Sequence, residues 1–166
     1  AAGGRIRELL HSAKERHEHD VVVQHVRGAL AGCCDIVDEP AAPELLRLGH
    51  VQHLVTPFRG ALRPGVADGD LLAALHPTPA VCGRPLRQAR AFIRDREGFD
   101  RGWYAGPVGW IGADGAEFAV AIRSALIHRH ALWSYAGAGI VPGSRPEAEW
   151  QEIDRKNRPF AELGAA

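Results

Sequence analysis

The stretch from Tyr135 to Lys156, YAGAGIVPGSRPEAEWQEIDRK, most constrains how this chain can fold. An apolar run that begins at Ala131 predicts a strand leading into it. Gly137 and Gly139 then let the backbone approach a ligand closely, because glycine has no Cβ. After these glycines the pattern changes to that of a helix. The stretch therefore predicts a strand, a glycine turn and a helix in direct succession.

The predicted helix carries Glu149, Glu152 and Lys156 along one face, since these positions are i, i+3 and i+7. Two carboxylates and an ammonium beside a glycine turn suit a divalent cation and a small carboxylated ligand. The alternative is a surface helix with a Glu152–Lys156 pair, which contributes about 0.3–0.5 kcal/mol. Lys14 and Lys156 are the only lysines among twenty basic residues, which favours a specific role for Lys156.

Composition limits the classes of partner. At 166 residues the chain is long enough for one domain with a core. Twenty basic and twenty acidic residues balance, which gives no electrostatic case for nucleic acid or an anionic membrane. No apolar run approaches the ~20 residues of a membrane-spanning helix, and no signal-peptide pattern opens the chain. Three cysteines without a C-x-x-C motif form no disulfide framework. We therefore expect a soluble, cytoplasmic protein.

The first half is predicted to begin with one long helix, Arg5 to Leu30, from its 3.6-residue recurrence of apolar residues. Within it, Glu15 and Glu18 form a second carboxylate pair on one face, although a charged run is most often a solvated face. His53 lies in a predicted strand, where a core or edge histidine is more common than a ligand. The shorter elements predicted here are helices over Ala42–Leu48, Asp70–Leu75 and Arg84–Arg96 and a strand over Val51–Arg63.

Three strands follow, over Gly102–Gly112, Ala116–Leu126 and Ala131–Ile140, and their hairpin-length connections predict an antiparallel meander. Arg123 falls inside the second strand, where it is either buried beside an anionic partner or on an exposed face of the sheet. A final helix runs from Pro146 to about Leu163. We predict an α+β fold, an antiparallel β-sheet flanked by helices.

Seven motifs occur in order: KERHEH at Lys14–His19, HLVTPF at His53–Phe58, HPTPA at His76–Ala80, FDRGWYAGPVGW at Phe99–Trp110, AIR at Ala121–Arg123, AGAGIV at Ala136–Val141 and EWQEIDRK at Glu149–Lys156. Together they resemble the chorismate-utilising enzyme family over Arg5 to about Leu163. Within that family, the HPTPA and FDRGW forms favour isochorismate synthases over the amine-transferring relatives.

The resemblance implies a magnesium site. Glu18 and Glu152 would be the Mg²⁺ ligands, with Glu15 and Glu149 as nearby carboxylates acting through water. Magnesium prefers octahedral oxygen coordination and keeps several waters, which suits such sparse ligation. The metal would hold the ring carboxylate of chorismate.

The resemblance also implies a substrate site for chorismate and isochorismate. Arg123 would clamp the enolpyruvyl carboxylate, because a planar guanidinium binds both oxygens. Gly137 would offer its backbone N–H and Lys156 a positive charge. The other residues implied to line this site are His53, Ala80 and Tyr104.

The family's general-base lysine and general-acid glutamate lie upstream of the KERHEH motif. By this resemblance, residues 1–166 are the C-terminal part of a chorismate-binding domain, with the N-terminal half absent. The resemblance implies an isomerase, isochorismate synthase. Because general acid–base groups each contribute about 10²–10⁴-fold, we expect no useful turnover from this chain alone.

Other functions remain open. The chain would otherwise be a non-catalytic or trans-complementing fragment that binds ligand or a partner chain, such as the missing N-terminal half. A salicylate synthase is a close enzymatic alternative, and the menaquinone, siderophore and salicylate pathways are not separated. A dinucleotide-binding module fails, because after Gly137 and Gly139 the next glycine is Gly143 and too little chain remains for a second strand.

Overall fold

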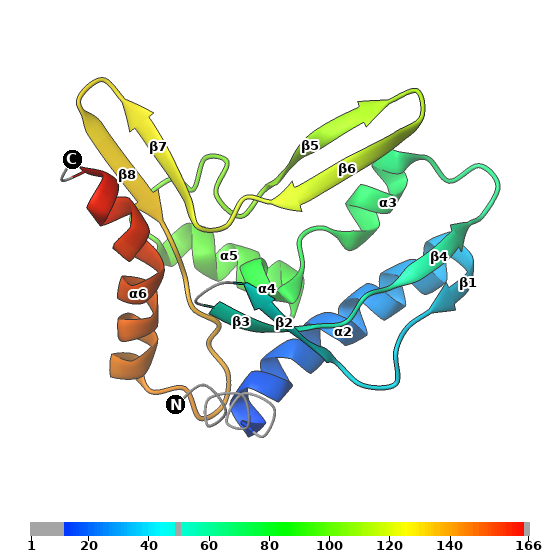
Figure 1. The fold of residues 1–166 in the computed structure, drawn as a ribbon, viewed down its shortest axis with the longest axis horizontal. Coiled ribbons are helices and arrows are strands. Elements are labelled where there is room, and N and C mark those ends of the chain that lie inside the picture. The colour runs from blue at the N-terminus through cyan, green and yellow to red at the C-terminus, as the bar shows by residue number, and fades with distance from the viewer. Residues whose placement is uncertain (1–11, 49–50, 165–166) are drawn as a thin grey trace. The chain divides into compact units, whose positions relative to one another are not determined.

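The computed structural model describes residues 12–48 and 51–164. The chain divides into two compact units, Ala1–Ala80 and Val81–Ala166. Figure 1 shows helices and short two-stranded ribbons in each. The α+β class expected from the sequence is confirmed.

The first unit is built around one long helix. The described elements of this unit are α2 (Ala13–Cys33), β1 (Cys34–Asp38), β2 (Glu44–Leu48), β3 (Val51–Val55), β4 (Arg59–Leu62) and α3 (Asp68–Leu75). Strand β1 pairs antiparallel with β4, and β2 pairs antiparallel with β3. Helix α2 packs on α3 and leads directly into β1.

At both ends of α2, side chains form hydrogen bonds with backbone groups of the helix. The Ser12 hydroxyl accepts a hydrogen bond from the backbone N–H of Glu15 at 3.3 Å, which is an N-cap. At the other end, the Arg63 guanidinium donates to the carbonyls of Ala31 and Gly32 at 3.0 and 3.1 Å. A small core of Leu30, Cys33 and Cys34 forms at this end, with Val26, Val37, Phe58, Val66, Leu71, Ala74 and Leu75 packed against it.

The second unit contains two β-hairpins and two longer helices. Its elements are α5 (Leu86–Arg96), β5 (Pro107–Gly112), β6 (Gly115–Val120), β7 (Ser124–His128), β8 (Ala131–Tyr135) and α6 (Pro146–Gly164), and the short α4 (Pro79–Cys82) lies at the boundary between the units. Strands β5 and β6 pair with each other, as do β7 and β8. Helix α6 lies beside β8 (Figure 1).

Two predictions for the first unit are wrong. Residues 44–48 of the predicted helix Ala42–Leu48 form strand β2, which pairs along its whole length with β3. Leu, Glu and Arg are good helix formers, but tertiary context overrides such propensities, and here a ladder of five pairs with β3 decides the outcome. The predicted strand Val51–Arg63 is two strands, because Pro57 between them has no N–H to donate to a ladder. The beginning of the predicted helix Arg5–Leu30 lies outside the described residues, and α2 continues to Cys33.

The predicted three-stranded meander is also wrong. Residues 102–105 form turns, so the first predicted strand begins only at Pro107. The second predicted strand divides into β6 and β7 at residues 121–123, where Arg123 has φ +50°. Arg123 is therefore an exposed residue between strands. The described residues form four separate two-stranded sheets instead of one.

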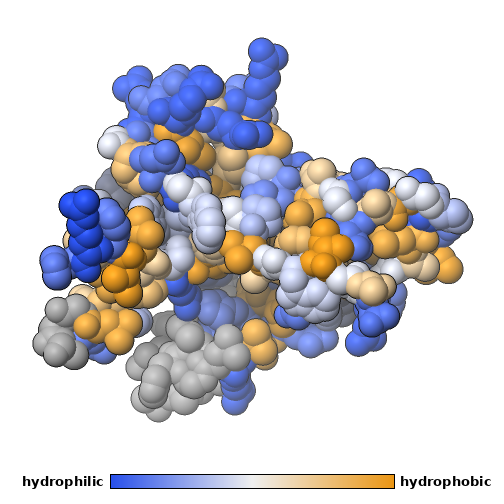
Figure 2. Space-filling model, turned by 90° about the horizontal axis from the view of Figure 1, so that it is seen from above, coloured by the Kyte–Doolittle hydropathy of each residue, from blue (hydrophilic) through white to orange (hydrophobic). Residues whose placement is uncertain are grey.

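Many large apolar side chains are exposed on both units. The face drawn in Figure 2 shows hydrophobic residues at the surface. Trp103 is 84% exposed and Ile127 73% exposed, and every residue of β5 is exposed. Among the described residues, the buried apolar positions are Leu30, Cys33, Cys34 and Ala105. Across 12–48 and 51–164, no helix combines the length and the apolar character needed to span a membrane.

Candidate functional site

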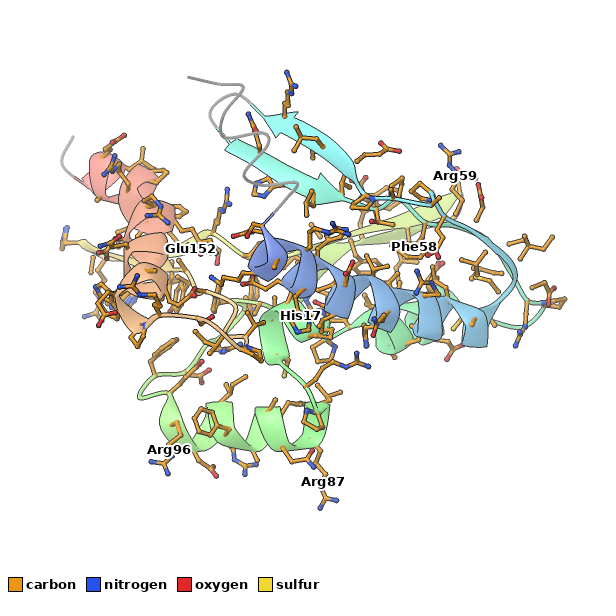
Figure 3. The ribbon with its side chains drawn as sticks, turned by 90° about the horizontal axis from the view of Figure 1, so that it is seen from below. His17, Phe58, Arg59, Arg87, Arg96 and Glu152 are labelled. Atoms are coloured by element: carbon orange, nitrogen blue, oxygen red, sulfur yellow. The ribbon has the colours of Figure 1, made fainter. Side chains whose placement is uncertain are left out.

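The side chain of Lys156 joins α6 to the glycine segment that follows β8. Its Nζ donates to the Gly137 carbonyl oxygen at 2.8 Å and lies 2.7 Å from Glu152 Oε1. The i, i+4 pair expected from the spacing is therefore present, and the same ammonium also fixes the backbone at Gly137. Glu152 projects from α6 (Figure 3). These contacts hold a carboxylate, an ammonium and a glycine backbone in one place.

Gly137 lies against the hydroxyl group of Tyr104. A Cβ added to Gly137 would be 2.8 Å from the Tyr104 hydroxyl oxygen, which is closer than van der Waals contact. The sequence predicted a close backbone approach at this glycine, with a ligand as the approaching group. In the structure, the approaching group is a side chain of the protein.

The Tyr104 ring contacts both an aromatic ring and a cation. Its ring stacks on Tyr135, with centroids 5.6 Å apart and an interplanar angle of 22°. Phe99 packs on Tyr135 in turn, with centroids 6.2 Å apart. The Arg101 guanidinium carbon lies 5.6 Å from the centre of the Tyr104 ring. Burial raises the pKa of the Tyr104 hydroxyl, with Arg101 opposing this shift, so the group stays a neutral donor at neutral pH.

Glu149 lies one turn before Glu152 on α6 and is only 4% exposed. A carboxylate so deeply buried needs a compensating charge, hydrogen bond or metal nearby. The pair Glu149 and Glu152 thus combines a buried carboxylate with a partly exposed one on the same helix face.

In the first unit, the second predicted carboxylate pair lies on α2. Glu15 and Glu18 are both partly buried, and Glu18 forms an ion pair with Lys14 at 3.4 Å. His19 shares a 2.7 Å hydrogen bond with the Thr56 hydroxyl, which ties the KERHEH motif to the HLVTPF motif. Burial lowers the pKa of His19, and Asp20 partly offsets this.

The remaining predicted residues lie on other elements. His53 is partly buried on β3, opposite Leu46 on β2. Ala80 is exposed in α4, and Arg123 is exposed between β6 and β7. The structure thus brings together four of the predicted site residues: Tyr104, Gly137, Glu152 and Lys156.

The carboxylate oxygens of the predicted metal ligands are of a type that binds magnesium. Each of the two helices α2 and α6 offers a pair of glutamate carboxylates, the hard oxygen ligands that Mg²⁺ prefers. Within the described ranges, no group of three or more His, Cys, Asp or Glu side chains is placed to hold a metal ion. Magnesium commonly uses one or two carboxylates together with water and substrate oxygens, and a glutamate pair provides that.

Two residues beside this cluster were missed from the sequence. Arg101 contacts the Tyr104 ring, and its guanidinium forms a salt bridge with Glu97. Their i, i+4 spacing and the place of Arg101 in the FDRGW motif were the available signals.

Comparison with known proteins identifies the family. The family described as chorismate binding enzyme matches residues 5–163, and the chain belongs to it. The chloroplastic isochorismate synthase of Catharanthus roseus is 44% identical over 157 residues, which are 94% of this chain and 27% of that protein. The salicylate biosynthesis isochorismate synthase of Pseudomonas aeruginosa is 48% identical over 145 residues, which are 87% of this chain and 30% of that protein.

A solved structure agrees. MenF, the menaquinone-specific isochorismate synthase from Escherichia coli, matches with a TM-score of 0.84 and 40% identity over 95% of this chain and 36% of the MenF chain. The fold and the similarity to isochorismate synthases expected from the motifs are confirmed. The chain spans only about a third of the length of these relatives.

Proposed function

We propose that this chain is the C-terminal, chorismate-binding part of an isochorismate synthase, an isomerase that converts chorismate into isochorismate with Mg²⁺. The observation that carries the proposal is the cluster in which Lys156 joins Gly137 to Glu152 while Tyr104 contacts Gly137. The similarity to isochorismate synthases supports the choice of reaction.

The cluster suits an anionic ring substrate. Lys156 supplies a positive charge, and the neutral Tyr104 hydroxyl supplies a hydrogen-bond donor beside the glycine backbone. Arg123 is assigned to the enolpyruvyl carboxylate, since an exposed guanidinium can form a two-point contact with a carboxylate. His53 and Ala80 are assigned to the ring of the substrate.

Glu18 and Glu152 are assigned to the metal, with Glu15 and Glu149 supporting it through water. When bound, Mg²⁺ would supply positive charge to neutralise the ring carboxylate of the substrate. The ammonium of Lys156 orients the Glu152 carboxylate through their ion pair. Glu149 places a second, buried carboxylate one turn away.

The chemical step needs groups that this proposal places in the N-terminal half of the protein. One group activates water to attack the ring, and the other protonates the hydroxyl that leaves. Each contributes about 10²–10⁴-fold, so residues 1–166 alone are expected to bind but not to turn over. Isochorismate formation by the purified chain would contradict this division of roles.

The test is calorimetric titration of chorismate into the chain, with and without Mg²⁺. We expect binding that requires Mg²⁺ and that weakens at least tenfold in Glu152→Gln, which removes the charge but keeps the side-chain size. Glu162→Gln makes the same change on an exposed part of α6 and is the control. Equal binding by Glu152→Gln and wild type, or binding indifferent to Mg²⁺, would overturn the metal assignment.

A second candidate function is that of a fragment that complements a partner chain, the N-terminal half of the enzyme. The exposure of apolar side chains on the hairpins favours it, because such surfaces are usually covered in a finished fold. Mixing the chain with a separately produced N-terminal half would then restore turnover. A salicylate synthase differs in its product, and analysis for salicylate and pyruvate in the same mixture distinguishes it. The cytoplasmic location stays a prediction from cysteine content.

A further inference from the structure

The segment between α5 and β5 is organised by the guanidinium of Arg101. Nε donates to Glu97 Oε2 at 2.6 Å, and Nη2 donates to the other oxygen of the same carboxylate. Nη1 donates to the Val81 carbonyl at 2.8 Å. All three nitrogens are therefore used, two of them in the fork geometry that makes Arg–carboxylate pairs strong and directional.

This pair differs from an ordinary surface ion pair on α5, that of Arg94 with Asp95. The side chains of Arg101 and Glu97 are 24% and 30% exposed, whereas those of Arg94 and Asp95 are 77% and 61% exposed. Exposed pairs contribute little because water screens them and their side chains lose entropy. A partly buried, two-point pair with a third bond to the backbone holds its guanidinium in one orientation.

The Arg101 guanidinium held in this way lies against the Tyr104 ring, with its central carbon 5.6 Å from the ring centre. The backbone supports the same contact, because the Tyr104 N–H donates to the Arg101 carbonyl at 2.9 Å. Tyr104 has two further neighbours: its ring stacks on Tyr135, and its hydroxyl lies close to Gly137. Arg101 therefore contacts Tyr104, a residue of the candidate site, without itself belonging to the set assigned to the substrate.

We propose that Arg101, fixed by Glu97, is a positioning residue that holds the Tyr104 hydroxyl against the backbone of Gly137. The substrate in this proposal, chorismate, rests on the proposed function. The positioning of Tyr104 by Arg101 does not. Loss of the fork frees the guanidinium, which removes one of the contacts that hold the Tyr104 ring. The hydroxyl then no longer has a fixed place beside Gly137 and Lys156.

The experiment reads Tyr104 directly. The chain has two tyrosines, so Tyr135→Phe leaves Tyr104 as the only tyrosine while keeping an aromatic ring for it to stack on. In this background, nuclear magnetic resonance follows the Tyr104 ring signals and their cross peaks to residue 135. The variants are Arg101→Gln, Arg101→Lys and Glu97→Gln. Arg87→Gln is the control, since Arg87 extends from α5 into solvent (Figure 3).

We expect all three variants to move the Tyr104 ring signals and weaken the cross peaks, with no change in the control. Arg101→Lys should fail to rescue, because an ammonium keeps the charge but cannot form the fork. If Arg101→Gln does not fold, the proposal is tested with Arg101→Lys. Unchanged Tyr104 signals in a folded Arg101→Lys chain would overturn the proposal.

Chorismate titration of the same variants in the otherwise wild-type chain tests the role at the site. We expect affinity to fall about tenfold, as for loss of one charge-assisted contact. Moved Tyr104 signals with unchanged affinity would overturn the positioning role. If the wild-type chain does not bind chorismate, the proposed function fails, and the ring signals still decide whether Arg101 holds Tyr104.

Discussion

At Gly137 the backbone of the candidate site lies close to the side chain of Tyr104. An alanine there would place its Cβ 2.8 Å from the Tyr104 hydroxyl oxygen, well inside the usual contact distance of about 3.5–4.0 Å. Tyr104 cannot retreat freely, because its ring is stacked on Tyr135 and lies against Arg101. The absence of a side chain at this position therefore belongs to the packing of the site itself.

We predict that Gly137→Ala lowers the free energy of unfolding by about 1–3 kcal/mol, the usual cost of overpacking. Tyr104→Phe removes the hydroxyl that the new methyl would meet, so the double variant should recover part of the loss. A coupling of about 1 kcal/mol in urea denaturation is the expected result. If Gly137→Ala costs the same with Phe at position 104, the contact with the hydroxyl is not what excludes alanine.

Helix α2 is the element on which the first unit depends, and Arg63 closes its C-terminal end. The guanidinium donates to the carbonyls of Ala31 and Gly32 and to Asp35, so a cation satisfies backbone groups that the helix leaves unpaired. The buried Cys33 and Cys34 follow at once, where the helix turns into β1.

We predict that Arg63→Ala destabilises the first unit by about 1 kcal/mol. Arg59→Ala is the matched control, since Arg59 is an exposed arginine of the neighbouring β4 (Figure 3). The readout is the urea midpoint, together with hydrogen exchange of the amides in the last turn of α2. Equal effects of the two variants would show that the bonds from Arg63 to the helix contribute nothing.

The sequence was a good guide to elements whose signal is local. The amphipathic helix predicted over Arg84–Arg96 is present as Leu86–Arg96, and the helix predicted from Pro146 ends one residue beyond Leu163. Strand β2 was missed because its ELLRL pattern suits a helix equally well, and only pairing with β3 decides the outcome. The break at Arg123 was missed for a similar reason, since a positive φ between two strands leaves no trace in hydrophobic alternation.

The candidate site was predictable to the extent that its residues share an element or a motif. Glu152 and Lys156 follow from helical spacing, and their i, i+4 contact is confirmed. The hydrogen bond from Lys156 to Gly137 and the approach of Tyr104 join segments far apart in sequence, and no spacing rule predicts them. The roles of these residues toward chorismate and Mg²⁺ stay predictions.

At the scale of the whole molecule, the two hairpins of the second unit are unusual. Two-stranded ribbons are marginally stable alone, and each exposes its strand edges. Leu126 and Trp133 face each other across β7 and β8, and both are exposed. Ile127, the next residue along β7, is also exposed, so this ribbon presents apolar side chains on both faces. Surfaces of this kind associate with whatever apolar surface is available.

We therefore predict that the isolated chain self-associates, with a sedimentation coefficient that rises with concentration. Ile127→Lys should reduce the association, because a charge on an apolar face must be desolvated for the face to be covered. Gln151→Lys adds the same charge at an exposed position of α6 and should leave association unchanged, which separates the local effect from that of net charge. A monodisperse wild-type monomer that melts cooperatively would contradict the prediction. It would mean that the ribbons are stable without a covering layer, and complementation by a partner chain would lose its main structural support.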